Sequence, residues 1–253
     1  VLVINLGLPP KKFTWRYKPK KNDEEETKSQ TPQTGSADPN EQDSKGPVEE
    51  EATRIITTTP QRFFREFVGV DPNDYINLFH DTIHPAGRRY RIRMSRNLYD
   101  GRDINYVNIE LDTLKQIAVK SIQGGDAVLF AADVSNDHNR KLGIMAKEIY
   151  DYKSIYNIDI RMTKAQRALY RASARNHGMV LVGADLQEGR PVKWRVENSW
   201  GTDDGSKGYW TMYDDWFDEN VYNIIAYKKY VPREVLELAR TEPVVLPPWD
   251  PML

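Results

Sequence analysis

The 253-residue sequence predicts an α+β fold, with helical segments followed by a β-rich half. Apolar residues recur at helical spacing from Leu111 to Ile122, and the pattern ends at Gly124, which predicts an amphipathic helix. Beyond residue 176, four segments of strand-like composition are separated by Gly, Asp and Asn turns: 177–183, 192–197, 208–213 and 221–228. No internal repeat interrupts this order.

Local signals predict the other elements. A helix is expected after Thr59-Pro60, and its aromatic residues Phe63, Phe64 and Phe67 share a face that we expect in a core. Thr163 and Gln166 form a capping-box pattern, which predicts a helix to about residue 176. A last helix is expected at 232–240. The expected strands before residue 176 are 75–79 and 127–132, with the basic segment 87–96 as a strand or a loop.

The composition excludes several classes of protein. The 36 basic and 37 acidic residues nearly cancel, so no global field attracts polyanions or membranes. The absence of cysteine excludes disulfides, cysteine-ligated metals and a thiol nucleophile within this chain. The longest apolar run, Val1–Ile4, is far shorter than the ~20 residues of a membrane helix, and no basic region precedes it as in a signal peptide. The expected location is the cytoplasm, with the mitochondrion as the alternative.

The sequence divides into stretches of different character. Residues 18–53 have no aromatic residue and a single large aliphatic one, Val48, which predicts a disordered polar insertion. The chain begins with Val, and we expect an upstream part to be missing. The expected regions are 1–17 as the end of a helical inserted region, 18–53 as the insertion, 54–110 as the remainder of the inserted region, 111–242 as the β-rich half and 243–253 as a proline-rich arm.

Three residues in the β-rich half fit one arrangement. His177 stands where a helix gives way to a strand, and Asn198 and Trp200 follow the end of another strand. An imidazole needs a partner that holds its tautomer, and an asparagine carbonyl supplies one without adding charge. A tryptophan beside that hydrogen bond excludes water and strengthens it. We therefore expect these three side chains to meet in a catalytic site.

Asn198–Gly201 (Asn-Ser-Trp-Gly), followed by Gly208-Tyr209, resembles the papain-like cysteine proteases. A wider set of motifs resembles the bleomycin hydrolase family within them: Phe13–Trp15, Lys141–Gly143, Lys193–Gly201, Asp215–Phe217 and Leu246–Met252. The resemblance covers nearly the whole chain except the 18–53 insertion. It implies a papain-like α+β fold, of which this chain holds the His- and Asn-bearing β-rich half and part of a helical inserted domain.

The resemblance also implies an activity and residue roles. His177 becomes the general base that pairs with a catalytic thiol, Asn198 orients it, and Trp200 shields their hydrogen bond. The implied enzyme is a thiol aminopeptidase that removes N-terminal residues from peptides, or cleaves related amides or thiolactones, without a cofactor. Its cysteine and an oxyanion-stabilising glutamine are expected upstream of residue 1, so we expect this chain alone to be inactive. In this family the subunits form ring-shaped homohexamers, and the C-terminal arm lies in the substrate cleft.

Two other groups of residues are candidates for binding. His80 and His84 have the i, i+4 spacing of a zinc pair, but Pro85 follows and no third ligand is evident, so we expect no metal. Arginines cluster in an extended basic segment, where they either form ion pairs or bind single-stranded nucleic acid: Arg88, Arg89, Arg91, Arg93 and Arg96. The alternative to the enzyme is therefore a non-catalytic, ring-forming or nucleic-acid-binding subunit.

Overall fold

The computed structural model describes residues 10–17, 53–158 and 161–253, and the chain forms two compact units, Val1–Asp71 and Pro72–Leu253. The expected insertion at 18–53 lies outside the described residues except for residue 53. Nothing in the described part forms a helix long and apolar enough to cross a membrane.

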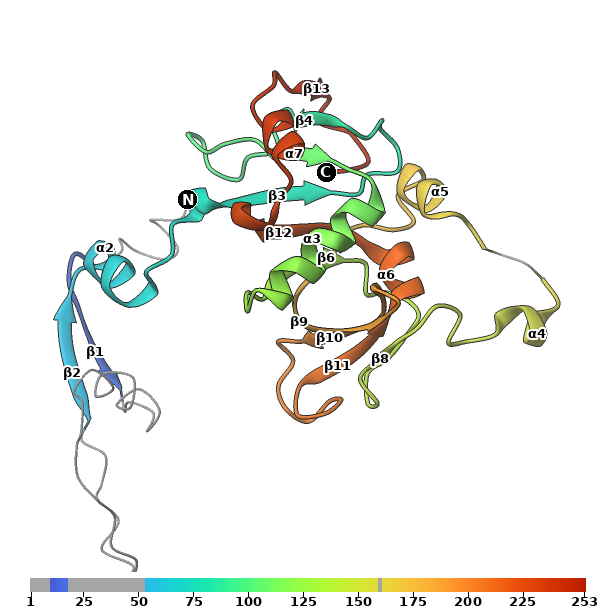
Figure 1. Cartoon of the computed structure of the whole chain (residues 1–253), viewed down its shortest axis with the longest axis horizontal. Helices are drawn as coiled ribbons and strands as arrows, with labels where there is room; N and C mark the ends of the chain where they lie inside the picture. The colour runs from blue at the N-terminus through green and yellow to red at the C-terminus, as the bar shows by residue number, and fades with distance from the viewer. Residues whose placement is uncertain (1–9, 18–52, 159–160) are drawn as a thin grey trace, which may run out of the picture. The chain divides into compact units, whose positions relative to one another are not determined.

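In the first unit, β1 (Phe13–Tyr17) and β2 (Arg54–Thr58) form an antiparallel pair, followed by α2 (Pro60–Phe63) and a π-helical turn, η2 (Phe64–Val68) (Figure 1). The expected helix start is confirmed, because the Thr59 hydroxyl accepts the backbone N–H of Arg62. Phe63 and Phe67 pack around the Trp15 ring, at 4.9 and 5.5 Å between ring centroids. Phe64 and Phe67 are each 41% exposed, so the expectation of a closed core here is wrong.

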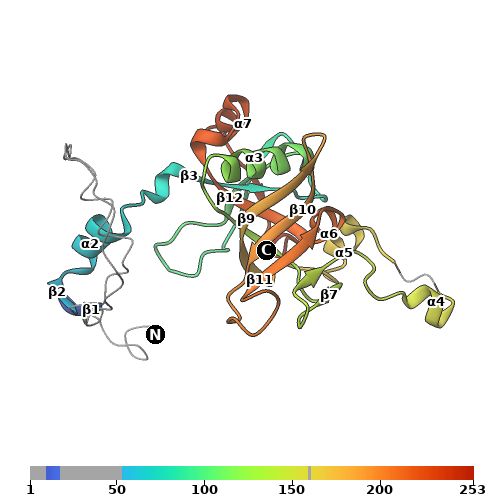
Figure 2. The same cartoon turned by 60° about the horizontal axis from the view of Figure 1, so that its bottom comes forward.

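The second unit is built on one mixed sheet in the order β13-β4-β5-β3-β12-β6-β9-β10-β11-β8-β7 (Figures 1 and 2). Most neighbours are antiparallel, whereas β3–β5, β4–β13 and β8–β11 are parallel. The strands are β3 (Tyr75–Phe79), β4 (Arg88–Ile92), β5 (Asn105–Asn108), β6 (Val128–Ala132), β7 (His138–Asn139), β8 (Ile144–Met145), β9 (His177–Gln187), β10 (Arg190–Glu197), β11 (Tyr209–Tyr213), β12 (Val221–Tyr227) and β13 (Val244–Leu246).

The longest helix, α3 (Leu111–Gln123), lies against the sheet through its apolar face, as its periodicity predicts. Leu114, Ile117 and Ala118 are buried there in the same core as the fully buried Trp194 and Trp216. The helix ends at Gly124, also as expected. The shorter helices are α4 (Tyr152–Tyr156), α5 (Lys164–Leu169), α6 (Asp214–Asn220) and α7 (Arg233–Leu238), with 3-10 turns η3 (Pro72–Asp74) and η4 (Lys228–Tyr230).

Most expected strands are confirmed, and several elements differ from expectation. The capping box at Thr163 is present, but α5 ends at Leu169, because Arg171 takes a left-handed backbone conformation at φ 56°. The proline-rich arm contains a strand that was not expected, β13, which pairs with β4. β5, β7, β8, α4 and α6 were not expected.

The compact units do not follow the expected regions of the sequence. The division falls between Asp71 and Pro72, within the expected region 54–110. β3 and β12 pair across the expected boundary at 110–111, with Leu78 opposite Ile224. The regions 54–110 and 111–242 therefore describe stretches of sequence that share one sheet.

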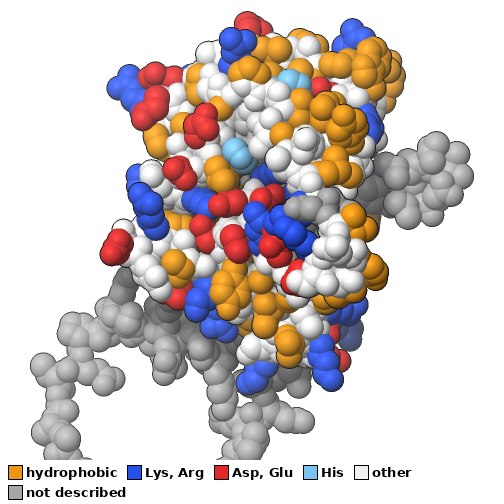
Figure 3. Space-filling view, turned by 90° about the vertical axis from the view of Figure 1, so that its right-hand side faces the viewer, with side chains coloured by type: hydrophobic (Ala, Val, Ile, Leu, Met, Phe, Trp, Pro, Cys, Tyr) orange, Lys and Arg blue, Asp and Glu red, His pale blue; other side chains and the backbone are white. Residues whose placement is uncertain are grey.

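Acidic and basic side chains lie interspersed over the middle of the face that looks to the right in Figure 1 (Figure 3). α5 and α6 carry ion pairs of this kind, since Glu219 is within 2.9 Å of Lys147 and 3.0 Å of Arg167. Such neutralised pairs leave this face without a field of one sign.

Candidate active site

The antiparallel pairing of β9 and β10 brings two expected catalytic residues together. His177 is the first residue of β9 and lies opposite Ala132 of β6. Asn198 directly follows β10, whose last residue, Glu197, lies opposite Val180. The beginning of β9 and the end of β10 consequently meet at the same edge of the sheet.

The His177 ring and the Asn198 side chain are joined by a hydrogen bond of 2.8 Å between Nε2 and Oδ1. Asn198 Oδ1 also accepts the backbone N–H of Ser199 at 2.8 Å, which identifies this atom as the carbonyl oxygen. His177 Nε2 must therefore donate. In the neutral ring the lone pair lies on Nδ1, which no described residue hydrogen-bonds. This arrangement leaves Nδ1 free to accept a proton.

Trp200 covers the imidazole as expected. Its ring stacks on that of His177, with 4.7 Å between centroids and 28° between planes. Trp210 of β11 meets Trp200 edge-on at 5.4 Å, and the Arg140 guanidinium lies 5.1 Å from the Trp200 ring centre. Sequence reasoning placed Trp210 on the next strand but gave it no role, and it missed Arg140, although Arg140 directly precedes the Lys141–Gly143 motif.

The loop after Asn198 is held by the segment around Arg140. Arg140 Nε lies 2.6 Å from Asp204 Oδ2, and the Gly205 N–H donates to Lys141 O at 3.2 Å. At Gly143, a Cβ atom would stand only 2.5 Å from Gly205 Cα. The two loops therefore approach so closely that both positions require glycine, and this contact fixes the loop that carries Trp200.

The residue before His177 is anchored to the neighbouring strand. Asn176 Nδ2 donates to Asp133 Oδ1 at 2.8 Å, and Asn176 Oδ1 accepts the Val134 N–H at 2.9 Å. Burial alone raises the pKa of the Asp133 carboxyl, but hydrogen bonds from Ser173, Ser135 and Asn176 hold that pKa below its ordinary value. Asp133 therefore stays ionised and fixes the start of β9.

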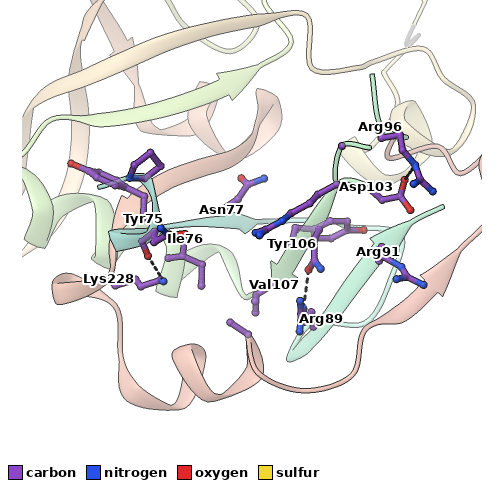
Figure 4. Close-up of a pocket in the computed structure, with 16 residues that line it drawn as sticks. Tyr75, Ile76, Asn77, Arg89, Arg91, Arg96, Asp103, Tyr106, Val107 and Lys228 are labelled. Atoms are coloured by element: carbon purple, nitrogen blue, oxygen red, sulfur yellow. Dashed lines mark hydrogen bonds and ion pairs between the residues drawn. The ribbon is translucent and has the colours of Figure 1, made fainter. Parts of the chain in front are cut away.

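The arginine cluster is divided between the two faces of β4. Arg89 and Arg91 line an open pocket of about 780 Å³ together with Arg96, Arg102 and Lys228 (Figure 4). Arg88 shares the other face with the buried Tyr90 and Ile92, because side chains alternate along a strand. Arg88 therefore does not share a face with Arg89 and Arg91.

Two of the remaining arginines have structural partners. Arg89 donates to Asn105 Oδ1 at 2.8 Å and to Thr241 O at 2.9 Å, and Arg96 pairs with Asp103 at 3.1 Å. Arg91 and Arg93 are exposed, and Arg93 follows β4. The cluster thus combines structural contacts with an open cationic surface.

His80 and His84 follow strand β3 and face different partners. His80 Nδ1 lies 3.4 Å from Ile109 O, and burial lowers the pKa of His80 to about 4, with a further lowering by Lys164. His84 stands between the carboxylates of Asp81 and Asp250. In the described parts of the chain, no three His, Cys, Asp or Glu side chains gather as metal ligands do.

The structure thus places His177, Asn198 and Trp200 together, as the resemblance to the papain-like proteases leads us to expect. Residues 47–253 match the Peptidase C1-like family, and the chain belongs to this family. It is 33% identical over 254 residues to aminopeptidase C from Lactococcus lactis subsp. cremoris and 36% identical over 260 residues to human bleomycin hydrolase. The matches cover 99% and 100% of this chain, and 52% and 51% of those proteins.

The crystal structure of PepW from Lactobacillus rhamnosis matches 99% of this chain and 51% of its own chain, with a TM-score of 0.81 and 35% identity. The expected family and the papain-like α+β fold are thus confirmed. The chain spans about half the length of the curated relatives it matches, and it contains no cysteine.

Proposed function

We propose that His177 and Asn198 are the general base and the orienting residue of a thiol aminopeptidase of bleomycin hydrolase type. The nucleophilic cysteine lies on a segment outside these 253 residues. The observation that carries this proposal is the 2.8 Å bond between His177 Nε2 and Asn198 Oδ1 beneath Trp200. Asn198 Nδ2 is buried without a hydrogen-bond partner among the described residues, whereas buried polar groups are normally paired. This unpaired atom supports the proposal that a segment outside these 253 residues completes the site.

The geometry fits general-base chemistry at the imidazole. His177 Nδ1 takes the thiol proton, and the thiolate sulfur attacks the carbonyl carbon of the first peptide bond. The C–N bond then breaks while the imidazolium returns the proton to the leaving amine, which leaves a thioester. Water attacks this thioester, His177 takes a proton from the water, and the proton returns to the sulfur as the acid departs. Throughout, Asn198 holds the ring orientation without adding charge.

The test uses the complete gene product and an aminoacyl fluorogenic substrate. We expect His177→Ala to lower kcat by about 10²–10⁴-fold, because the base is removed, and Asn198→Ala to lower it less. Asn97→Ala, at an exposed loop position, is the matched control and should leave kcat unchanged. The 253-residue chain alone should show no turnover. Wild-type kcat in His177→Ala, or no cysteine in the complete product, would refute the proposal.

A second proposal concerns the open face of β4. We propose that Arg91 and Arg102 contact the phosphates of single-stranded nucleic acid, since both are exposed and line the cationic pocket with Lys228 (Figure 4). Replacing both by Gln should weaken binding of all sequences and reduce the salt slope by roughly one unit for each phosphate no longer neutralised. Arg88→Gln, on the opposite face, is the matched control. Equal affinities in the double variant and the control would contradict this proposal.

A third proposal concerns quaternary structure. From the family resemblance, we propose that the complete protein forms a ring-shaped homohexamer. Native mass spectrometry of the complete product measures its subunit number directly, and a monomer at micromolar concentration would overturn it.

A further inference from the structure

A buried polar chain ties the C-terminal tail to the loop after β3. The ring of His84 lies between two carboxylates, with Nδ1 2.6 Å from Asp81 Oδ2 and Nε2 3.2 Å from Asp250 Oδ2. Both acidic residues are almost fully buried, at 3% and 4% exposure. Asp81 is itself fixed, because Oδ1 accepts the backbone N–H groups of Ile83 and His84.

The interactions among Asp81, His84 and Asp250 depend on whether the His84 ring carries one proton or two. A neutral imidazole has one N–H and one lone pair, so it can donate to only one of two carboxylates. Both ring nitrogens of His84 face carboxylate oxygens: Nδ1 is hydrogen-bonded to Asp81 Oδ2, and Nε2 forms an ion pair with Asp250 Oδ2 only when the ring is protonated. When the ring loses a proton, one nitrogen lone pair faces a buried carboxylate, which is repulsive.

Burial moves the pKa of several titratable neighbours of the ring away from neutrality. Tyr106 donates its hydroxyl to Asp81 Oδ2 at 2.8 Å, and burial and the Asp81 charge raise its pKa. Burial also raises the pKa of Tyr90, whose ring lies 5.2 Å from that of His84. The other charged or titratable groups acting on this cluster are Arg175, Arg88 and His80. His84 is the member of this cluster that lies between the two carboxylates.

The tail has further anchors besides His84. β13 pairs with β4, Arg171 donates to Trp249 O, and Arg175 donates to Met252 O at 2.6 Å. Asp250 Oδ1 also accepts the Met252 N–H at 2.9 Å, and Met252 is buried. Arg175 lies two residues before His177, so the tail is bound to the segment that leads into the candidate active site.

We propose that the His84 imidazolium is the positioning residue that holds residues 247–253 in place, and that its deprotonation loosens them. The tail-anchoring role stands on the geometry alone. Its consequence for catalysis, a tail held in the substrate cleft of an aminopeptidase, rests on the proposed function.

The experiment measures the tail in the 253-residue chain itself, so it does not depend on peptidase activity. Hydrogen exchange of the Asp250, Met252 and Leu253 amides, which are the hydrogen-bonded N–H groups of the tail, is followed from pH 6 to pH 9.5 and corrected for the intrinsic pH dependence of exchange. Release of Leu253 by a carboxypeptidase is measured alongside. We expect wild-type protection to fall about tenfold or more as pH rises, since the ion pair between His84 and the buried Asp250 is lost.

Two substitutions separate this role from general packing. Asp250→Asn keeps an oxygen that accepts the Met252 N–H but removes the charge, so the tail should be loose at pH 6 and independent of pH. His84→Arg keeps a cation with several donors and should restore protection at pH 9.5. If His84→Arg fails to fold, the wild-type pH profile and the Asp250→Asn variant still test whether the charged contact of His84 anchors the tail.

Nitrogen NMR of the His84 ring provides the direct readout, with both nitrogens protonated while the tail is protected. A flat wild-type exchange profile, full protection in Asp250→Asn, or a singly protonated ring in the protected state would each overturn the proposal.

Discussion

Gly143→Ala tests whether the close approach of two loops fixes the candidate site. Gly143 has φ +64°, and an added Cβ would lie 2.5 Å from Gly205 Cα, a backbone atom that cannot rotate away. Gly189, in the turn between β9 and β10, has φ +78° and open space around its missing Cβ. Gly189→Ala therefore carries the same backbone strain without the steric clash.

The two substitutions differ by the cost of the clash. A left-handed alanine costs roughly 1–2 kcal/mol at either site. Overpacking at Gly143 adds about 1–3 kcal/mol, because Gly205 must shift and pull on the loop held by Arg140. We expect Gly143→Ala to lower the free energy of unfolding by about 2 kcal/mol more than Gly189→Ala does.

Urea denaturation followed by tryptophan fluorescence measures this difference. With m values of about 1–3 kcal/mol/M, the midpoints should differ by roughly 1 M. The resonances of the His177 ring should also shift in Gly143→Ala, since the loop carrying Trp200 moves, and should stay in place in Gly189→Ala. Equal midpoints for the two variants would refute the view that the loop contact is tightly packed.

Three further predictions concern charge and shielding. Burial lowers the pKa of Lys164 from 10.5 to about 7, so the unfolded chain binds more protons between these values, and the free energy of unfolding should rise with pH in that window. A pH series of urea midpoints checks this, and Lys164→Met should flatten the rise. Lys115→Met leaves the carboxylates of α6 without their buried cation and should lower stability by about 2–4 kcal/mol, whereas Lys193→Met, at an exposed ion pair, should cost under about 1 kcal/mol in the same assay. Trp200→Ala should lower kcat of the complete enzyme by about tenfold or more, because water reaches the bond at His177, and an unchanged rate would deny the shielding role.

Local patterns in the sequence were sufficient for the framework of the site. The 3.6-residue periodicity of α3 predicts its buried face, because a helix repeats its contacts along one side. Strand-like composition places His177 at the start of one strand and Asn198 after the end of another. Two antiparallel neighbours joined by the short Glu188-Gly189 turn then bring these ends together.

Elements with little buried surface could not be predicted in this way. α4 is a single helical turn without buried residues, so its sequence carries no amphipathic pattern. The three residues of β13 expose Val244 and Val245, and only Leu246 is buried, which is too short a pattern to distinguish from an extended tail. The side of β4 on which each arginine lies followed only once the strand's register was known.

The sequence by itself determined the family, and it predicted that His177, Asn198 and Trp200 lie together, because these residues lie at strand ends and in contiguous motifs. Only the tertiary structure showed that Arg140 lies over Trp200, that Gly143 meets Gly205, and that His84 joins Asp81 to Asp250. The partners in these contacts come from segments up to 166 residues apart. No local periodicity specifies such pairs, because they form only when the sheet brings β4, β9 and β13 into one fold.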